Sequence, residues 1–265
     1  MGNYSFFLGC PSAEAASRDD RSEQYWHQDF LPANQGGWGP SLSAKYAVPV
    51  LWVACFSRED EILVARTLTM TEDQARAARS AGVDPGPHDM SFMGLWVSTE
   101  TARIRIAARK RGILEAIPAP LRSAYGDLID AWADHLHAHY AQGVFLDGDD
   151  VFGMSGNDES AEALRALLDA LARMESGEAS LLSGDIELLS PLPKFQFLTP
   201  EETPSDAASG WRAQFAGSAL LESAVWPPEP TADEIAFAAS LPRMSWQDRL
   251  KTQNPPPQKP WWKFW

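Results

Sequence analysis

Hydrophobic residues recur at the helical period in two long segments of the chain. Between residues 121 and 140 the apolar positions fall three or four residues apart, so they share one face of a helix, and Gly143 follows it. A stripe of leucines at 164–171 predicts a second helix from about Asp158 to Met174, which Gly177 ends. These are the clearest helices of the chain.

Cap and turn residues predict shorter helices. Residues 71–81 begin with a threonine cap and two acidic residues and end before Gly82. Residues 231–241 likewise carry two acids in their first turn. The long polar stretch 11–40 is predicted to hold a helical piece around 13–16, or to be a functional loop.

One dense apolar run, residues 46–56, contains Pro49. A proline suits the first turn of a buried helix that reaches about Arg58. In a central strand the same proline would remove a donor from the hydrogen-bond ladder. The helix is therefore favoured, with a strand as the alternative.

Short apolar segments bounded by turn residues predict strands at five places: 3–8, 92–97, 144–146, 186–189 and 195–198. Residues 103–106, Arg-Ile-Arg-Ile, alternate at period two, which indicates a half-buried strand over 102–107. The alternative is a strand at 92–97 followed by a helix, because 107–117 also suits a helix.

Together these elements predict an α+β protein with a small mixed or antiparallel sheet and several packed helices. The chain of 265 residues is expected to form one globular domain over 1–253, with a subdivision near 143 as the alternative. Residues 254–265 form a separate Pro- and Trp-rich C-terminal tail, whose Asn-Pro-Pro-Pro segment favours an extended, stiff linker.

Charge narrows the range of partners. The net charge is −14, which argues against binding to phosphate backbones, since that needs clustered Lys and Arg. Residues 144–206 hold 14 acidic and three basic residues, whereas 102–122 hold six basic and one acidic. The acidic stretch suits the attraction of a basic protein, and equally suits an ordinary solvated surface.

Cys10 and Cys55 both lie in apolar runs, which predicts buried free thiols without a disulfide. The chain opens without a signal-peptide pattern, and no apolar run approaches the ~20 residues that cross a bilayer. A cytoplasmic protein without stable membrane insertion is expected, and no cofactor is expected.

Two constellations are candidates for metal chemistry. His135 and His139 are four residues apart on one helix face, a spacing that lets two imidazoles share a zinc ion, although Leu136 stands where zinc proteases carry glutamate. Alternating acids, Asp147, Asp149 and Asp150, gather hard-cation ligands in a turn, but the calcium-loop register fails. Local hydrogen bonding at the edge of the core and helix capping explain both groups more simply.

Motifs for other chemistry are weaker still. Ser155 lacks the flanking glycine spacing of the hydrolase elbow, and there is no Walker-type loop or dinucleotide glycine fingerprint. The sequence therefore leans away from an enzyme.

The tail carries four large aromatic residues near its end: Trp261, Trp262, Phe264 and Trp265. So much apolar surface is expected to dock on another surface rather than stay in water. The groove on the chain's own domain is the first expectation, a partner protein is the second, and a membrane interface is the third.

Three segments resemble uncharacterised bacterial proteins of toxin–immunity loci: Asn3–Leu8, Ala47–Trp52 and the Lys259–Trp265 ending. The resemblance implies a cytosolic immunity protein that binds and blocks a cognate toxin, and it implies no catalytic residues. The acidic balance of the chain is compatible with a basic toxin domain as that partner. Two alternatives stand beside it. They are a metal-dependent hydrolase that uses His135, His139 and the Asp147–Asp150 turn, and a scaffold or adaptor that uses the aromatic tail.

Surface carboxylates of the acidic stretch are the predicted partner-binding residues of such a protein, since they would steer a basic partner: Asp147, Asp149, Asp150, Asp158, Glu159 and Glu162.

Overall fold

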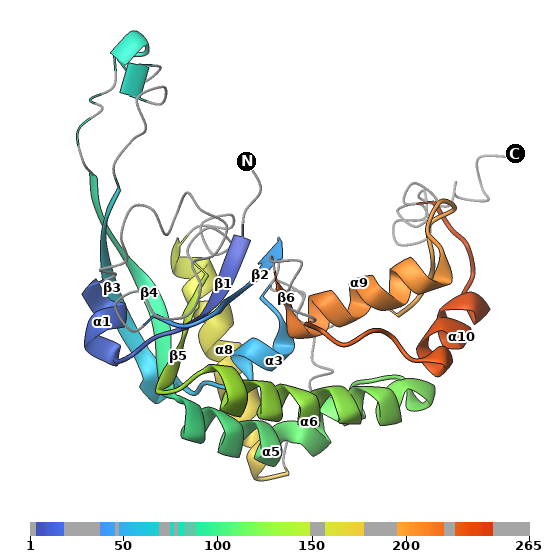
Figure 1. The fold of residues 1–265 in the computed structure, drawn as a ribbon. Coiled ribbons are helices and arrows are strands. Elements are labelled where there is room, and N and C mark those ends of the chain that lie inside the picture. Colours follow the sequence, from blue (N-terminus) through green and yellow to red (C-terminus); the bar gives the residue numbers. More distant parts are fainter. Residues whose placement is uncertain are drawn as a thin grey trace, which may run out of the picture.

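The computed structural model describes residues 4–18, 38–45, 48–68, 75–76, 79–82, 84, 86, 88–148, 157–177, 195–219 and 226–245 (Figure 1). The strands in this part of the chain are β1 (Tyr4–Gly9), β2 (Ser41–Lys45), β3 (Glu61–Leu68), β4 (His88–Ser98), β5 (Gly143–Asp147) and β6 (Ser218–Ala219). The helices are α1 (Ala13–Arg18), α3 (Val50–Val53), α5 (Thr99–Glu115), α6 (Arg122–His139), α8 (Asn157–Glu175), α9 (Pro204–Ala216) and α10 (Ala232–Ser240). Two 3₁₀ turns are η1 (Arg58–Asp60) and η2 (Ala119–Leu121).

The strands form one sheet in the order β3-β4-β5-β1-β2-β6, in which every neighbouring pair is antiparallel. The described part of the chain is thus an α+β fold with an antiparallel sheet and packed helices, as the sequence predicts. β3 and β6 are the two edge strands.

Side chains alternate between the two faces of the sheet, and each face has its own core. The larger core joins one face to α3, α5, α6, α8 and α9, and at its centre the Phe7 ring meets the rings of Trp52 and Trp132 at centroid distances of 5.6 and 5.1 Å. The smaller core lies on the other face, where Ala16 of α1 and Trp38 pack on Phe145 and Val64. Figure 1 shows α5 and α6 running side by side below the sheet.

A buried ion pair fastens α9 to α10. The guanidinium of Arg212 donates to both carboxylate oxygens of Glu234 at 2.8 and 2.6 Å, and also to the Pro228 carbonyl at 2.9 Å. The same carboxylate accepts from the backbone and the hydroxyl of Thr231, which caps α10. Glu234, expected only as an acid in a helix's first turn, therefore serves two elements at once.

The most periodic segments were predicted correctly. The helices predicted at 121–140 and 158–174 are α6 and α8, and their apolar stripes are buried. The helix predicted at 231–241 is α10. Strands β1, β4 and β5 and the helix at 13–16 are confirmed, and Cys10 and Cys55 are buried and free.

Pro49 does start a helix, but α3 is a single turn that ends at Val53, with Pro49 at the N-cap. Of the two alternatives for this region, the strand at 102–107 is wrong and the strand at 92–97 followed by a helix is confirmed, because residues 102–107 lie in α5. The alternation misled because Arg105, which reads as a polar surface residue, is buried. Residues 195–198 form a turn with one bridge at Leu198 and not a strand.

Several predicted segments lie outside the described residues. Of the helix at 71–81, residues 75–76 and 79–80 are helical and Gly82 has a positive φ of 73°, as a helix stop requires. The strand at 186–189 and the tail at 254–265 are not described. No helix in the described ranges is long and apolar enough to cross a membrane.

Candidate functional site

The two histidines of α6 lie together at the edge of the larger core. The His135 and His139 rings have centroids 4.5 Å apart, as their spacing predicts. His135 stacks on Trp226 at 4.6 Å and on Trp132 at 5.7 Å, with interplanar angles of 22° and 19°. The two indole rings are themselves 5.3 Å apart, so the His135 imidazole belongs to a three-ring aromatic cluster, and His139 is exposed beside it.

Burial determines the protonation of His135. Desolvation, with the nearby His139 as a second cause, lowers the pKa of His135 from 6.5 to about 4. Its Nε2 atom is buried and has no hydrogen-bond partner among the residues that the structure describes. The imidazole is thus neutral at physiological pH and takes part in packing.

Metal ligation needs more than this pair. Within the described ranges, no group of three or more His, Cys, Asp or Glu side chains is placed to hold a metal ion. Asp149 and Asp150, which the metal-hydrolase alternative requires, lie outside those ranges. His135 and His139 thus supply two ligands at most from the part of the chain that the structure describes.

The predicted partner-binding acids lie in different settings. Asp147 is the last residue of β5 and only 3% exposed, so it is an interior group of the sheet. Asp158 and Glu159 belong to the first turn of α8, whose side chains there are not described, and Glu162 is exposed one turn later. Glu162 is thus the one member of the set that the structure places on the surface.

Ion pairs hold α8 against the start of β3. Arg165 of α8 donates to both oxygens of Glu61 at 2.9 to 3.1 Å, and Asp169 accepts from Arg58 at 3.2 Å. The hydrogen bond and charge of Glu61 raise the pKa of Arg165. Asp169 of the acidic stretch therefore helps to fasten α8, and the exposed Glu162 adds to the negative charge near Arg165.

The basic stretch turns partly inward. Arg105 binds Glu59 at 2.7 Å and also Asp60, and donates to the Cys55 carbonyl. Arg109, which is 1% exposed, binds Glu175 at 2.7 Å and the carbonyls of Ala54 and Phe56. The two guanidiniums thus satisfy the backbone that follows α3.

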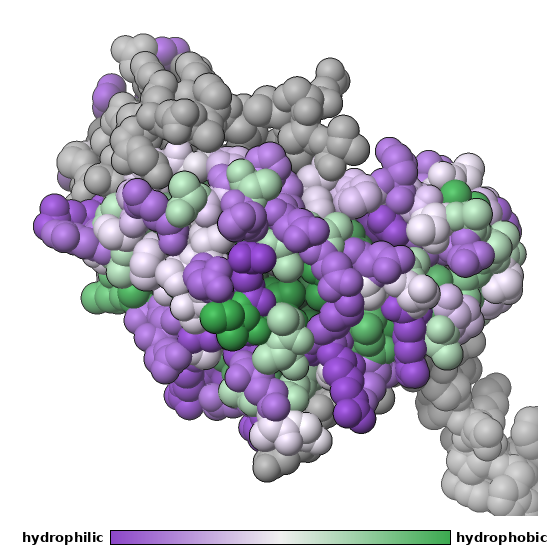
Figure 2. Space-filling view, turned by 60° about the horizontal axis from the view of Figure 1, so that its bottom comes forward, coloured by the Kyte–Doolittle hydropathy of each residue, from purple (hydrophilic) through white to green (hydrophobic). Residues whose placement is uncertain are grey.

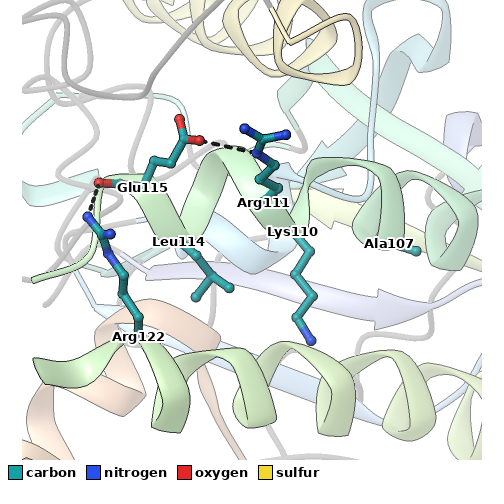
Figure 3. A pocket seen from close by; sticks show the side chains of 6 residues that line it. All are labelled: Ala107, Lys110, Arg111, Leu114, Glu115 and Arg122. Carbon is teal, nitrogen blue, oxygen red and sulfur yellow. Dashed lines mark hydrogen bonds and ion pairs between the residues drawn. The ribbon is translucent and has the colours of Figure 1, made fainter. Parts of the chain in front are cut away.

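Three further cations of this stretch, Lys110, Arg111 and Arg122, line a shallow hollow of about 420 Å³ between α5 and α6 (Figure 3). Lys110 extends toward α6 and binds Asp130 at 2.7 Å, and Arg111 reaches Glu115 at 3.4 Å. Arg122 donates to the carbonyls of Glu115 and Ile117. Lys110 and Arg111 are thus paired with carboxylates, whereas the Arg122 guanidinium is held by backbone carbonyls. On this side of the molecule hydrophilic and hydrophobic side chains are interspersed (Figure 2).

Exposed apolar side chains give a further surface feature. Leu63 is 71% exposed and Ile104 is 60% exposed, and they are the large hydrophobic residues that stand out on the described surface. Leu63 lies on β3 opposite Met93 of β4, and therefore on the face of the larger core. Glu61 lies two residues earlier on the same face and binds Arg165 of α8. Glu162 lies one turn before Arg165 on that helix.

The buried thiol of Cys55 carries no reactivity. Burial raises its pKa to about 12, and its Sγ donates to the Leu51 carbonyl at 3.3 Å. A thiolate nucleophile at this position is therefore excluded near neutral pH.

Comparisons of the chain with family models, with characterised proteins and with solved structures found no match in any of the three.

Sequence reasoning missed the site's main elements. Strand β3 was not predicted, although Ile62, Leu63 and Val64 are strong strand formers between polar residues. A search for β-branched and aliphatic runs without proline would have found it. The partners of Arg105 and Arg109, by contrast, leave no local signal in the sequence.

Proposed function

We propose that this protein is a non-catalytic binding protein that blocks a cationic partner protein, as an immunity protein blocks its toxin in the cytosol. The observation that carries the proposal is Leu63, a large apolar side chain 71% exposed on the edge strand β3. Exposed apolar side chains beside polar ones are typical of protein-binding surfaces.

The surroundings of Leu63 favour a basic partner. Exposed Glu162 lies on α8 one turn before Arg165, which binds Glu61 of β3. Glu59, at the start of the same region, has a side chain 77% exposed. With a net charge of −14 over the whole chain, the protein's field attracts cationic proteins and speeds their encounter.

The roles of the potentially reactive groups are compatible with binding by occlusion. His135 packs on two indoles, Cys55 is buried, and Arg109 is paired with Glu175. These side chains build the scaffold that presents β3 and α8.

The test is co-expression with the product of an adjacent toxin-like gene. We expect the two proteins to co-purify and growth to be restored. Glu162→Lys should weaken the complex about tenfold, since one charge pair near an interface contributes on the order of 1 kcal/mol. Glu201→Lys is the matched control, because Glu201 is exposed elsewhere and the change in net charge is the same. Failure to form any complex would remove the proposal, and equal loss in both variants would exclude α8 as the contact.

A further inference from the structure

The two edges of the sheet are built differently. The β6 edge is described over Ser218–Ala219, and Gly217 just before it is buried against the Trp52 indole. β3 is eight residues long and pairs with β4 through eight consecutive residue pairs, without a bulge. Within the described ranges β3 pairs with β4 alone, so a row of its backbone groups faces outward.

β3 also lacks the usual protective residues. Its sequence, Glu-Ile-Leu-Val-Ala-Arg-Thr-Leu, contains no proline, glycine or lysine. Its acidic residue, Glu61, is engaged by Arg165 of α8. A long, regular and largely apolar edge is a template for another strand.

One face of β3 is covered, and the other is open beyond Glu61, which Arg165 of α8 engages. Ile62 and Val64 point into the smaller core, where Ala15 and Ala16 of α1 pack on them. Leu63 and Ala65 point to the opposite face and are exposed. An added strand would therefore gain a side-chain contact with Leu63 as well as backbone hydrogen bonds.

We infer that the β3 edge binds an extended, cationic segment of a partner protein by strand addition. The inference rests on the proposed function for the partner being a basic protein. An extended segment fits because the free groups are those of a strand edge, which pair with another strand and not with a helix. A cationic segment fits because the chain carries −14 and Glu162 and Glu59 flank the edge.

Charge also decides against a second copy of this chain as the occupant. Edge-to-edge pairing of two copies would bring two molecules of −14 together, at a cost that rises as salt is lowered. A cationic strand is instead attracted by the negative charge of the protein, so its binding strengthens as salt is lowered.

The full-length protein can be tested with short synthetic peptides. The probe is a capped peptide in which lysine alternates with valine, and its controls replace lysine by glutamate or valine by proline. Binding is followed by fluorescence anisotropy, and the location by hydrogen exchange of the β3 amides. Of the three peptides, we expect only the lysine–valine peptide to bind and to slow the exchange of alternate β3 amides. Its binding should weaken as salt is added.

Two variants assign the binding to this edge. Leu63→Lys should weaken peptide binding about tenfold, because it removes an apolar contact and its charge repels the lysines of the peptide. Ile104→Lys is the matched control, since Ile104 is comparably exposed on helix α5, and it should leave binding unchanged. Ala65→Lys, on the same face as Leu63, is a second test should Leu63→Lys lower the melting temperature.

The inference is overturned if no peptide binds, if the glutamate peptide binds equally well, if protection falls on another element, or if both leucine and isoleucine variants act alike. Its failure is separable from that of the proposed function. A cognate toxin that binds Leu63→Lys as tightly as the unchanged protein leaves the function standing and removes the edge. Peptide binding at β3 without any complex with the toxin would support the edge as a binding site and remove the proposed function.

Discussion

The sheet ends in two edges that have opposite characters. At β6, Gly217 and the Ala216 carbonyl are enclosed, because the indole nitrogens of Trp52 and Trp226 both donate to that carbonyl at 2.9 and 3.1 Å. At β3, an eight-residue strand carries Leu63 in solvent. The β6 edge is enclosed by buried indoles from two other segments of the chain, while β3 pairs with β4 and is covered on one face by α1.

The contrast separates stability from association. A residue enclosed on all sides cannot change without displacing its neighbours, since protein interiors are close-packed. A residue in solvent changes with little effect on folding, but any partner that covers it will respond. Substitutions near β6 should therefore alter unfolding, and those on β3 should alter binding.

The largest effect is expected from Gly217→Ala. Gly217 has a φ of 74°, and an added Cβ would lie 2.0 Å from Cζ2 of Trp52. Backbone strain and overpacking together should cost about 4 kcal/mol of unfolding free energy, measured by denaturant unfolding.

Gly210→Ala is the control on the same side of the molecule. Gly210 lies in α9 with open space around the added Cβ, so the substitution should stabilise the protein by about 0.5–1 kcal/mol. Equal destabilisation by both variants would contradict the enclosure of Gly217.

A slightly smaller loss is expected from Arg212→Ala. It leaves the fully buried carboxylate of Glu234 without its guanidinium partner, which should cost about 3 kcal/mol. Thermal or urea unfolding measures the loss. Arg111→Ala, at an arginine 92% exposed, is the control and should change stability by less than about 0.5 kcal/mol. If the two arginine variants unfold alike, the buried pair does not stabilise the fold.

The stack beside β6 should also give a pH dependence. The folded pKa of His135 is lowered from 6.5 to about 4, so as pH falls the unfolded chain takes up the proton first. Stability is therefore full above pH 6.5 and is lost between 6.5 and about 4, by roughly 2 kcal/mol once partial solvent exposure is allowed for.

His135→Phe should remove this slope of unfolding free energy against pH and keep a ring in the stack. His137→Gln, at an exposed histidine of the same helix, should keep the slope. A slope that survives His135→Phe would assign it to other groups.

The smallest effect on folding is expected on β3. Leu63→Lys should shift the unfolding free energy by no more than about 0.5 kcal/mol, because most of the leucine side chain is already in water. Calorimetry compares it with the unchanged protein. A loss of several kcal/mol would show that the two edges do not differ as described.

Much of the fold can be predicted from local pattern, and the reason is physical. The stripes of α6 and α8 repeat over 18 and 19 residues, so one mistaken position does not change the assignment. The Arg-Ile-Arg-Ile segment is short, and its reading as a strand depended on Arg105 being a surface residue. Burial of that arginine follows from Glu59 and Asp60, which are distant in sequence.

The candidate site was less predictable for the same reason. Proximity of His135 and His139 follows from helix geometry, and was predicted. The stack on Trp226, the pairing of Glu61 with Arg165 and the exposure of Leu63 depend on tertiary packing. Asp147 illustrates the limit, since its acidic neighbours suggest a surface turn while its place at the end of β5 makes it interior.

The two inward arginines of α5 have a consequence for the order in which the chain acquires structure. A single turn such as α3 is not stable alone, since helix nucleation is unfavourable. The carbonyls of Ala54, Cys55 and Phe56 accept hydrogen bonds from Arg105 and Arg109, which lie about 50 residues further along the chain. Arg109 in turn forms its ion pair with Glu175 of α8. During synthesis the first third of the protein therefore lacks these native hydrogen bonds until α5 and α8 have left the ribosome. Until then its apolar residues are exposed, and we expect this segment to be prone to aggregation.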